Sequence, residues 1–240
     1  MNDFMTKKRL GRIPKMSEAA WLIGIVLCAL GVAISTKTGF GLSMVAAPPY
    51  IIHVMVSNIF PWFSHGMSEY LWQALQLLIM CVIVRSFKVK YLLSFVTAVV
   101  YGVILDGWSL LVGGGEIPES IWLRILFFVL SEALISLSIA FVFKTYLVPQ
   151  APECVVVEIA RRFGKSTSRI KIIYDIISFS ISALLAVAAF FTEGGIVGVG
   201  IGTVILTFIN APIIRMWSSL LDRIFVFDAA FVKLEKWFRR

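Results

Sequence analysis

The sequence has few charged residues for its length. Only 15% of its 240 residues are Asp, Glu, Lys or Arg, whereas 59% are hydrophobic and the mean hydropathy is +0.91. Soluble domains carry about 25% charged residues, and one soluble core could not bury this much apolar surface. The apolar runs are about 20 residues long and continuous, which favours membrane-spanning helices over the alternating ten-residue strands of a β-barrel.

Groups that carry out catalysis or bind metals are also scarce. The three cysteines, Cys28, Cys81 and Cys154, lie in or beside apolar segments without the spacing of a disulfide framework or a metal site. His53 and His65 are twelve residues apart without an acidic or cysteine partner, so we expect no metal site. No Ser/His/Asp, Cys/His or paired-carboxylate arrangement is present. We therefore expect neither an enzyme nor a bound cofactor.

Six apolar runs have about the 20 residues needed to cross hydrocarbon. The basic start, Lys7-Lys8-Arg9, leads into the first run without a small-residue cleavage site, so we expect no cleavable signal peptide. The fold class predicted is an all-α membrane protein with six transmembrane helices, over residues 17–35, 67–84, 91–112, 121–143, 170–191 and 195–217.

The net charge of +8 is distributed as topology requires, and not as nucleic-acid binding does. Lys and Arg gather at both ends of the chain and in the second and fourth connections. The first connection has only Lys37, and the third and fifth have acidic residues alone. Because cytoplasmic loops hold the excess of basic residues, both termini are expected in the cytoplasm. We expect a multi-pass protein of the bacterial inner (plasma) membrane, with the lipid bilayer as a partner and no nucleic acid.

Two connections, 36–65 and 144–169, are long and interrupted by proline and glycine. Each holds an apolar stretch too short to span, 46–59 in one and 154–160 with its flanks in the other, which favours a re-entrant or interfacial segment. They follow the first span of each half. Three crossings per half is an odd number, so the halves are predicted to be inverted repeats. The domains predicted are a basic N-terminus (1–15), two three-helix repeats (16–115 and 116–218) and a cytoplasmic amphipathic tail (219–240).

Broken helices leave backbone groups free to face a ligand, and the positive N-terminal end suits an anionic or carbonyl group. Polar residues at the breaks are therefore candidates for substrate binding, as are the polar residues within spans. Turn residues in interfacial loops, structural carboxylates and amides that join helices are the alternatives. Glu132, in mid-span, fits a proton carrier, a cation ligand or one partner of a buried hydrogen-bonded pair. The candidates are Lys37, Thr38, Gly41, Ser43, Glu69, Asp106, Glu132, Gln150, Asp175 and Asn210.

Two small-residue patterns predict helix contacts. Gly198 and Gly202, in a glycine-rich run that no strand precedes, indicate close helix packing and not a nucleotide loop. Ala29 and Ala33 form a face that packs internally or docks a partner helix.

Three short motifs resemble those of the YczE/YyaS/YitT-like bacterial membrane proteins. They are Lys37-Thr38-Gly39-Phe40-Gly41-Leu42-Ser43, Tyr101-Gly102-Val103-Ile104-Leu105-Asp106, and Gly200-Ile201-Gly202-Thr203 with Asn210-Ala211-Pro212. Met44 and Ala211 depart from that pattern, which has proline and glycine there. The resemblance implies a membrane fold and brings no settled substrate.

The function predicted is a transporter or permease for a small polar metabolite, with its site at the repeat interface. One alternative is a substrate-capture subunit of a multi-component importer, based on the six spans, the small size and the Ala29/Ala33 face. The other is an accessory protein without transport activity that acts through its tail. The small-molecule substrate stays unknown, and homo-oligomers stay open.

Overall fold

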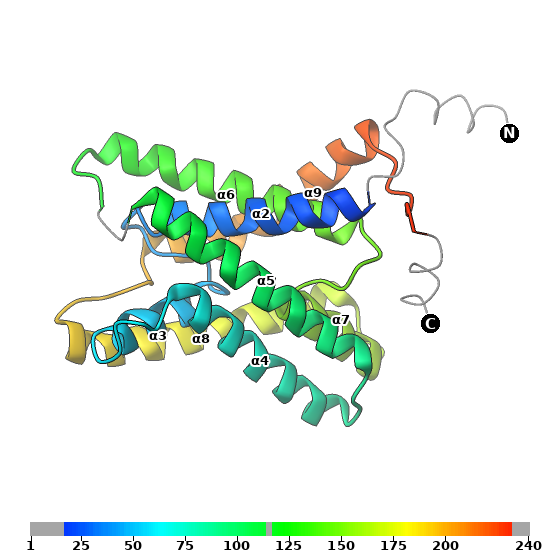
Figure 1. Cartoon of the computed structure of the whole chain (residues 1–240), viewed down its shortest axis with the longest axis horizontal. Helices are drawn as coiled ribbons and strands as arrows, with labels where there is room; N and C mark the ends of the chain where they lie inside the picture. Colours follow the sequence, from blue (N-terminus) through cyan, green and yellow to red (C-terminus); the bar gives the residue numbers. More distant parts are fainter. Residues whose placement is uncertain (1–16, 114–116, 232–240) are drawn as a thin grey trace, which may run out of the picture.

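The computed structural model describes residues 17–113 and 117–231, and this part of the chain is helical (Figure 1). The predicted basic segment 1–15 lies outside it. The helices are α2 (Ser17–Ser35), α3 (Ala47–Ser57), α4 (His65–Val84), α5 (Val89–Val112), α6 (Ile121–Phe143), α7 (Ala151–Phe163), α8 (Thr167–Glu193) and α9 (Ile201–Ile224).

Six of these helices, α2, α4, α5, α6, α8 and α9, are long and apolar enough to cross a membrane, which confirms the predicted number of spans. Their outward side chains are large and apolar; Leu110 is 84% exposed and Phe191 is 82% exposed. Such a surface is stable only against lipid tails. The chain is therefore a multi-pass membrane protein.

The sixth span begins later than predicted. Residues 195–200 form a loop in which Gly198 has a φ of +74°, and α9 starts at Ile201. Gly198 and Gly202 therefore do not share one helix, as the predicted span 195–217 implied, although Gly198 is closely packed, since a Cβ there would lie 2.7 Å from Ile51 Cγ1 of α3. Gly202 still allows a close approach, because a Cβ there would lie 2.8 Å from the Phe40 carbonyl oxygen.

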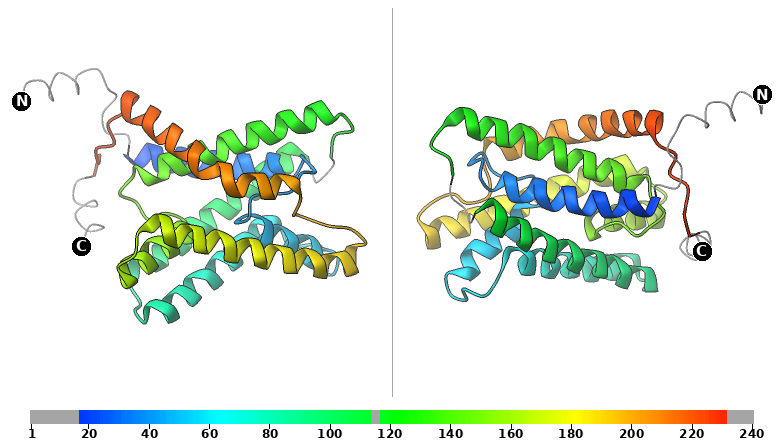
Figure 2. Two further views of the ribbon diagram at one scale, coloured as in Figure 1. Left: turned by 180° about the vertical axis from the view of Figure 1, so that it is seen from behind. Right: turned by 45° about the horizontal axis from the view of Figure 1, so that its top comes forward.

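Helix α2 lies between α5 on one side and α6 on the other (Figures 1 and 2). Helix α6 also packs on α9, and α4 packs on α5 and α7. The short helix α3 contacts α4 and α8, and the short helix α7 contacts α4, α5 and α8. Although both are described along their whole length, α8 and α9 barely contact each other, and they diverge in Figure 2.

Helices α3 and α7, of 11 and 13 residues, are too short to span and begin in the middle of the bundle. Just before α3, the Met44 carbonyl accepts a hydrogen bond from Ser182, halfway along α8. At the start of α7, the Ala151 N–H donates to Gln73, halfway along α4. From these starts the two helices run toward opposite ends of the bundle (Figure 1).

The chain leaves the helical state after Ile224. Residues 225–231 are not helical, and the Phe225 and Phe227 rings contact Phe141 of α6. The Glu18 carboxylate accepts hydrogen bonds from the N–H groups of residues 230 and 231. Of the predicted amphipathic tail, 219–240, residues 219–224 continue α9 and residues 225–231 are bound to the bundle, whereas residues 232–240 lie outside the described residues.

Candidate functional site

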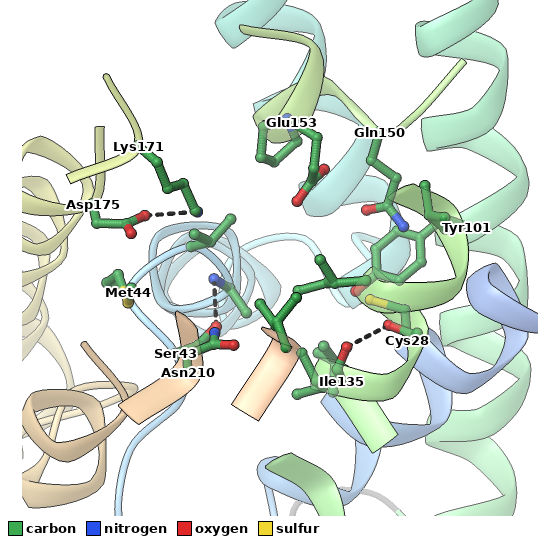
Figure 3. A pocket seen from close by; sticks show the side chains of 18 of the residues that line it. Cys28, Ser43, Met44, Tyr101, Ile135, Gln150, Glu153, Lys171, Asp175 and Asn210 are labelled. Atoms are coloured by element: carbon green, nitrogen blue, oxygen red, sulfur yellow. Dashed lines mark hydrogen bonds and ion pairs between the residues drawn. The ribbon is translucent and has the colours of Figure 1, made fainter. Parts of the chain in front are cut away.

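A cavity lies between the starts of the two short helices (Figure 3). Its unfilled space, including the open mouth, is about 1050 Å³. Helices α2, α4, α5, α6, α7, α8 and α9 contribute side chains, together with the loop before α3. Besides apolar groups, polar side chains line it: Ser43, Glu69, Gln73, Tyr101, Ser138, Gln150, Glu153, Lys171, Asp175, Thr207 and Asn210.

The N-terminal ends of α3 and α7 both border this cavity, through residues 43–46 and through Gln150, Pro152 and Glu153. Proline fits the first helical turn because its missing N–H has no helical acceptor there. The first three residues of α3 are Ala47, whose N–H bonds the Ser43 carbonyl, and two prolines. The first turn of α3 therefore has no free N–H group to donate to an anion, in contrast to the prediction for this end.

Glu69 is a buried carboxylate on the α4 side of the cavity. The residue is 5% exposed, and its carboxylate accepts a 3.5 Å hydrogen bond from Gln73 Nε2, one turn later. The Gln73 Oε1 accepts the Ala151 N–H at 3.2 Å, which fixes the amide between α4 and α7. Glu69 thus has an amide neighbour but no cationic partner among the described residues.

On the opposite side, Lys171 and Asp175 of α8 form an ion pair, with 2.7 Å between Nζ and Oδ1. Glu153 of α7 points its carboxylate into the space between this pair and Tyr101 (Figure 3). Burial raises the pKa of the Glu153 carboxyl, and nearby Lys171 lowers it in part. Sequence reasoning missed Glu153, because an acid in the first turn of a short helix is also the ordinary choice for helix stability.

Two buried polar atoms on the cavity wall lack a hydrogen-bond partner within the described part of the chain. They are Asn210 Oδ1 of α9 and Trp72 Nε1 of α4. A buried polar atom without a partner is costly, and such an atom at a cavity wall is available to a ligand. The alternative prediction is that Asn210 joins two helices, but its Oδ1 accepts no hydrogen bond from the described residues of another helix.

Half of the predicted site residues meet at this cavity: Ser43, Glu69, Gln150, Asp175 and Asn210. Lys37, Thr38 and Gly41 instead lie where the loop before α3 meets the loop before α9. There the Leu42 N–H donates to the Gly198 carbonyl at 2.9 Å, and the Gly202 N–H donates to the Phe40 carbonyl at 2.8 Å. The Thr38 carbonyl accepts from Arg124 Nε at 2.7 Å.

The remaining two predicted residues also lie away from the cavity lining. Asp106 accepts hydrogen bonds from Ser64 Oγ at 2.6 Å and the Gly66 N–H at 2.7 Å, so it anchors the start of α4 to α5. Glu132 is 4% exposed, and neither carboxylate oxygen has a hydrogen-bond partner in the described residues. One of the three roles predicted for Glu132 is membership of a buried hydrogen-bonded pair, and the described residues supply no second member of such a pair.

Two polar clusters join residues too distant in sequence to be paired by spacing. Glu158 of α7 accepts from Lys88 at 3.0 Å, Tyr91 at 2.8 Å and Arg161 at 2.6 Å. His53 and His65 stack, with ring centroids 5.6 Å apart. Within the described residues, no group of three or more His, Cys, Asp or Glu side chains is arranged for a metal ion.

Comparison with known proteins gives one family. Residues 16–219 match the family of unknown function DUF6198, and because the match covers most of the chain, the protein belongs to this family. No curated protein and no solved structure matches.

Proposed function

We propose that this member of a family without known function is a secondary transporter or permease for a small polar metabolite. The observation that carries the proposal is the central cavity, onto which the starts of both short helices open. Substrate sites of many transporters lie near the bilayer midplane, between discontinuous helices. In this interpretation α3 and α7 are re-entrant helices, and each moves with the half of the chain that contains it.

The packing pattern supports two inverted three-helix repeats, residues 16–115 and 116–218. The contacts of α2 with α5 have their counterpart in those of α6 with α9, and the contacts of α3 with α4 in those of α7 with α8. The packing of α4 on α5 has no such counterpart, because α8 and α9 barely contact each other. Across the halves, α3 packs on α8 as α7 packs on α4. Related contacts of this kind permit two alternative arrangements of the same halves around one site.

The positive-inside rule supports an orientation with both termini in the cytoplasm. The cavity then extends from the middle of the bundle toward the cytoplasmic side, because Val142 and Phe143 at the end of α6 also line it. The contact of residues 38–42 with residues 198–202 then closes the outer side. This arrangement corresponds to an inward-facing state, in which outward opening requires that loop contact to break. The three short motifs further support a relationship to the YczE/YyaS/YitT-like proteins.

One argument for the importer-subunit alternative is a docking face for a partner helix, and the structure does not support it. Ala29 and Ala33, the suggested docking face, are 0% and 2% exposed and belong to the protein's own core. The accessory-protein alternative acts through the tail, of which residues 225–231 are bound to the bundle and residues 232–240 lie outside the described residues. We prefer transport by the chain alone, because the cavity offers a place for a substrate.

Uptake into proteoliposomes tests this function. Purified protein is reconstituted without any other component, incubated with a metabolite extract, and the vesicle contents are compared by mass spectrometry with those of protein-free vesicles. We expect at least one small polar compound to accumulate only with protein. Asn210→Ala, which removes the unpartnered cavity amide, should reduce that uptake. Asn58→Ala is the matched control, because its amide bonds Glu193 on the surface. No accumulation, or equal loss in both variants, contradicts the proposal.

A further inference from the structure

We infer that the cavity binds a small organic ammonium cation, with its positive group near Glu69 and Glu153 and its apolar body against α6. The inference rests on the proposed function for its biological setting, but binding itself can be tested without transport.

The carboxylates of the cavity exceed its cations. Glu69, Glu153 and Asp175 line it, with Lys171 as the opposing cation, and Lys171 is already paired with Asp175. Glu69 and Glu153 come from different halves of the chain, and both line this cavity. Their carboxylates contribute negative charge to one enclosed space, and an opposite charge near them stabilises it.

The unsatisfied hydrogen-bonding capacity also matches an ammonium group. Glu69 is 5% exposed, and its carboxylate accepts only the long hydrogen bond from Gln73 among the described residues. Asn210 Oδ1 is a buried acceptor without a partner in the described chain. An ammonium group has three donors and no acceptor. The indole N–H of Trp72, a buried donor that also lines the cavity, does not match an ammonium group.

The short helices do not supply the donors that an anion needs. In the first turn of α3, Ala47 is bonded to Ser43, and Pro48 and Pro49 have no N–H. In the first turn of α7, Ala151 is bonded to Gln73, and Pro152 has no N–H. Anion sites at helix N-termini depend on free N–H groups. These two ends therefore shape the cavity without favouring an anion.

The apolar body is indicated by the remaining walls. Ile135, Ile139, Val142 and Phe143 of α6 line the cavity together with Ile214 of α9. These side chains form an apolar surface within it. Apolar substituents gain free energy in such surroundings, whereas a fully polar cation would lose its hydration without replacement.

Three probes with the same phenylethyl body and different charge test the inference: 2-phenylethylamine, 2-phenylethanol and 3-phenylpropionate. Calorimetric titration at pH 7.5 into protein in lipid nanodiscs, against empty nanodiscs, measures binding. The amine should bind at least about 10-fold more tightly than the alcohol or the acid, as expected for one charge-assisted hydrogen bond. Glu69→Gln and Glu153→Gln should each weaken the amine about 10-fold or more. Glu193→Gln, which changes an exposed carboxylate outside the cavity, should leave it unchanged.

Thermal unfolding identifies variants that fail to fold, and the two cavity variants provide independent readings. Equal affinity for the three probes, preference for the acid, or unchanged amine binding in both cavity variants overturns the inference. Amine binding without uptake in proteoliposomes upholds the inference and counts against the transporter. Uptake of an uncharged metabolite without amine binding does the reverse.

Discussion

Replacement of Gly41 by alanine tests how the loop before α3 is held against the loop before α9. Gly41 has a φ of +90°, a region that residues with a Cβ rarely adopt. A Cβ there would also clash with the backbone nitrogen of Gly200 and the side chain of Thr203, and would lie 2.9 Å from the Val199 carbonyl carbon. Two of these three obstacles are backbone atoms, so no change of rotamer relieves the overlap.

The size of the effect follows from two contributions. Alanine at a positive φ costs about 1 kcal/mol in backbone strain. The clash forces the loops apart, and the two hydrogen bonds that join them, Leu42 to Gly198 and Gly202 to Phe40, contribute about 1 kcal/mol each. We therefore expect Gly41→Ala to lower the free energy of unfolding by about 3 kcal/mol, the sum of these contributions.

Gly164→Ala is the matched control. Gly164 ends α7 with a φ of +59°, but nothing lies within 4 Å of a Cβ built on it. It should lose only the strain, about 1 kcal/mol. Unfolding in mixed micelles with increasing SDS, followed by tryptophan fluorescence, measures both variants. If the two lose the same stability, the loop contact is weaker than its geometry indicates and the reasoning is refuted.

Three further predictions concern stability in the same assay. Gly102→Ala should destabilise by about 2 kcal/mol through overpacking, because its Cβ would lie 2.7 Å from the Gly66 carbonyl oxygen. Gly107→Ala, with no atom within 4 Å, should be neutral or stabilising; a loss there as large as that of Gly102→Ala would contradict this account. Glu158→Gln should lower the free energy of unfolding by about 2 kcal/mol, since a buried carboxylate that joins three partners loses its charge. An unchanged free energy of unfolding would show that this cluster does not stabilise the fold. Stability should fall as the pH drops below about 6.5, because burial lowers the pKa of His53 in the folded state and the unfolded chain then binds the proton more tightly. His53→Gln should reduce this dependence, and an unchanged slope would assign it to other groups.

The sequence by itself determined the number of spans and the two short helices. The bilayer sets a minimum length for a crossing helix, so a run of about 20 apolar residues can be recognised without knowledge of its neighbours. The same length criterion separated α3 and α7 from the spans, and their prolines marked where they begin. The start of α9 was missed, because apolar residues and glycines continue through 195–200 while the chain there forms a loop.

Only the tertiary structure decided which polar residues meet. Glu69 lies with Gln73 and the start of α7, whereas Asp106, equally acidic and also within a span, is bonded to the start of α4. Glu153 enters the cavity although its local sequence suggests an ordinary helix start. Hydropathy indicates how many consecutive residues can lie in lipid, but not how the helices rotate and cross. Rotation and crossing bring Glu69 and Glu153, which are 84 positions apart, into one cavity.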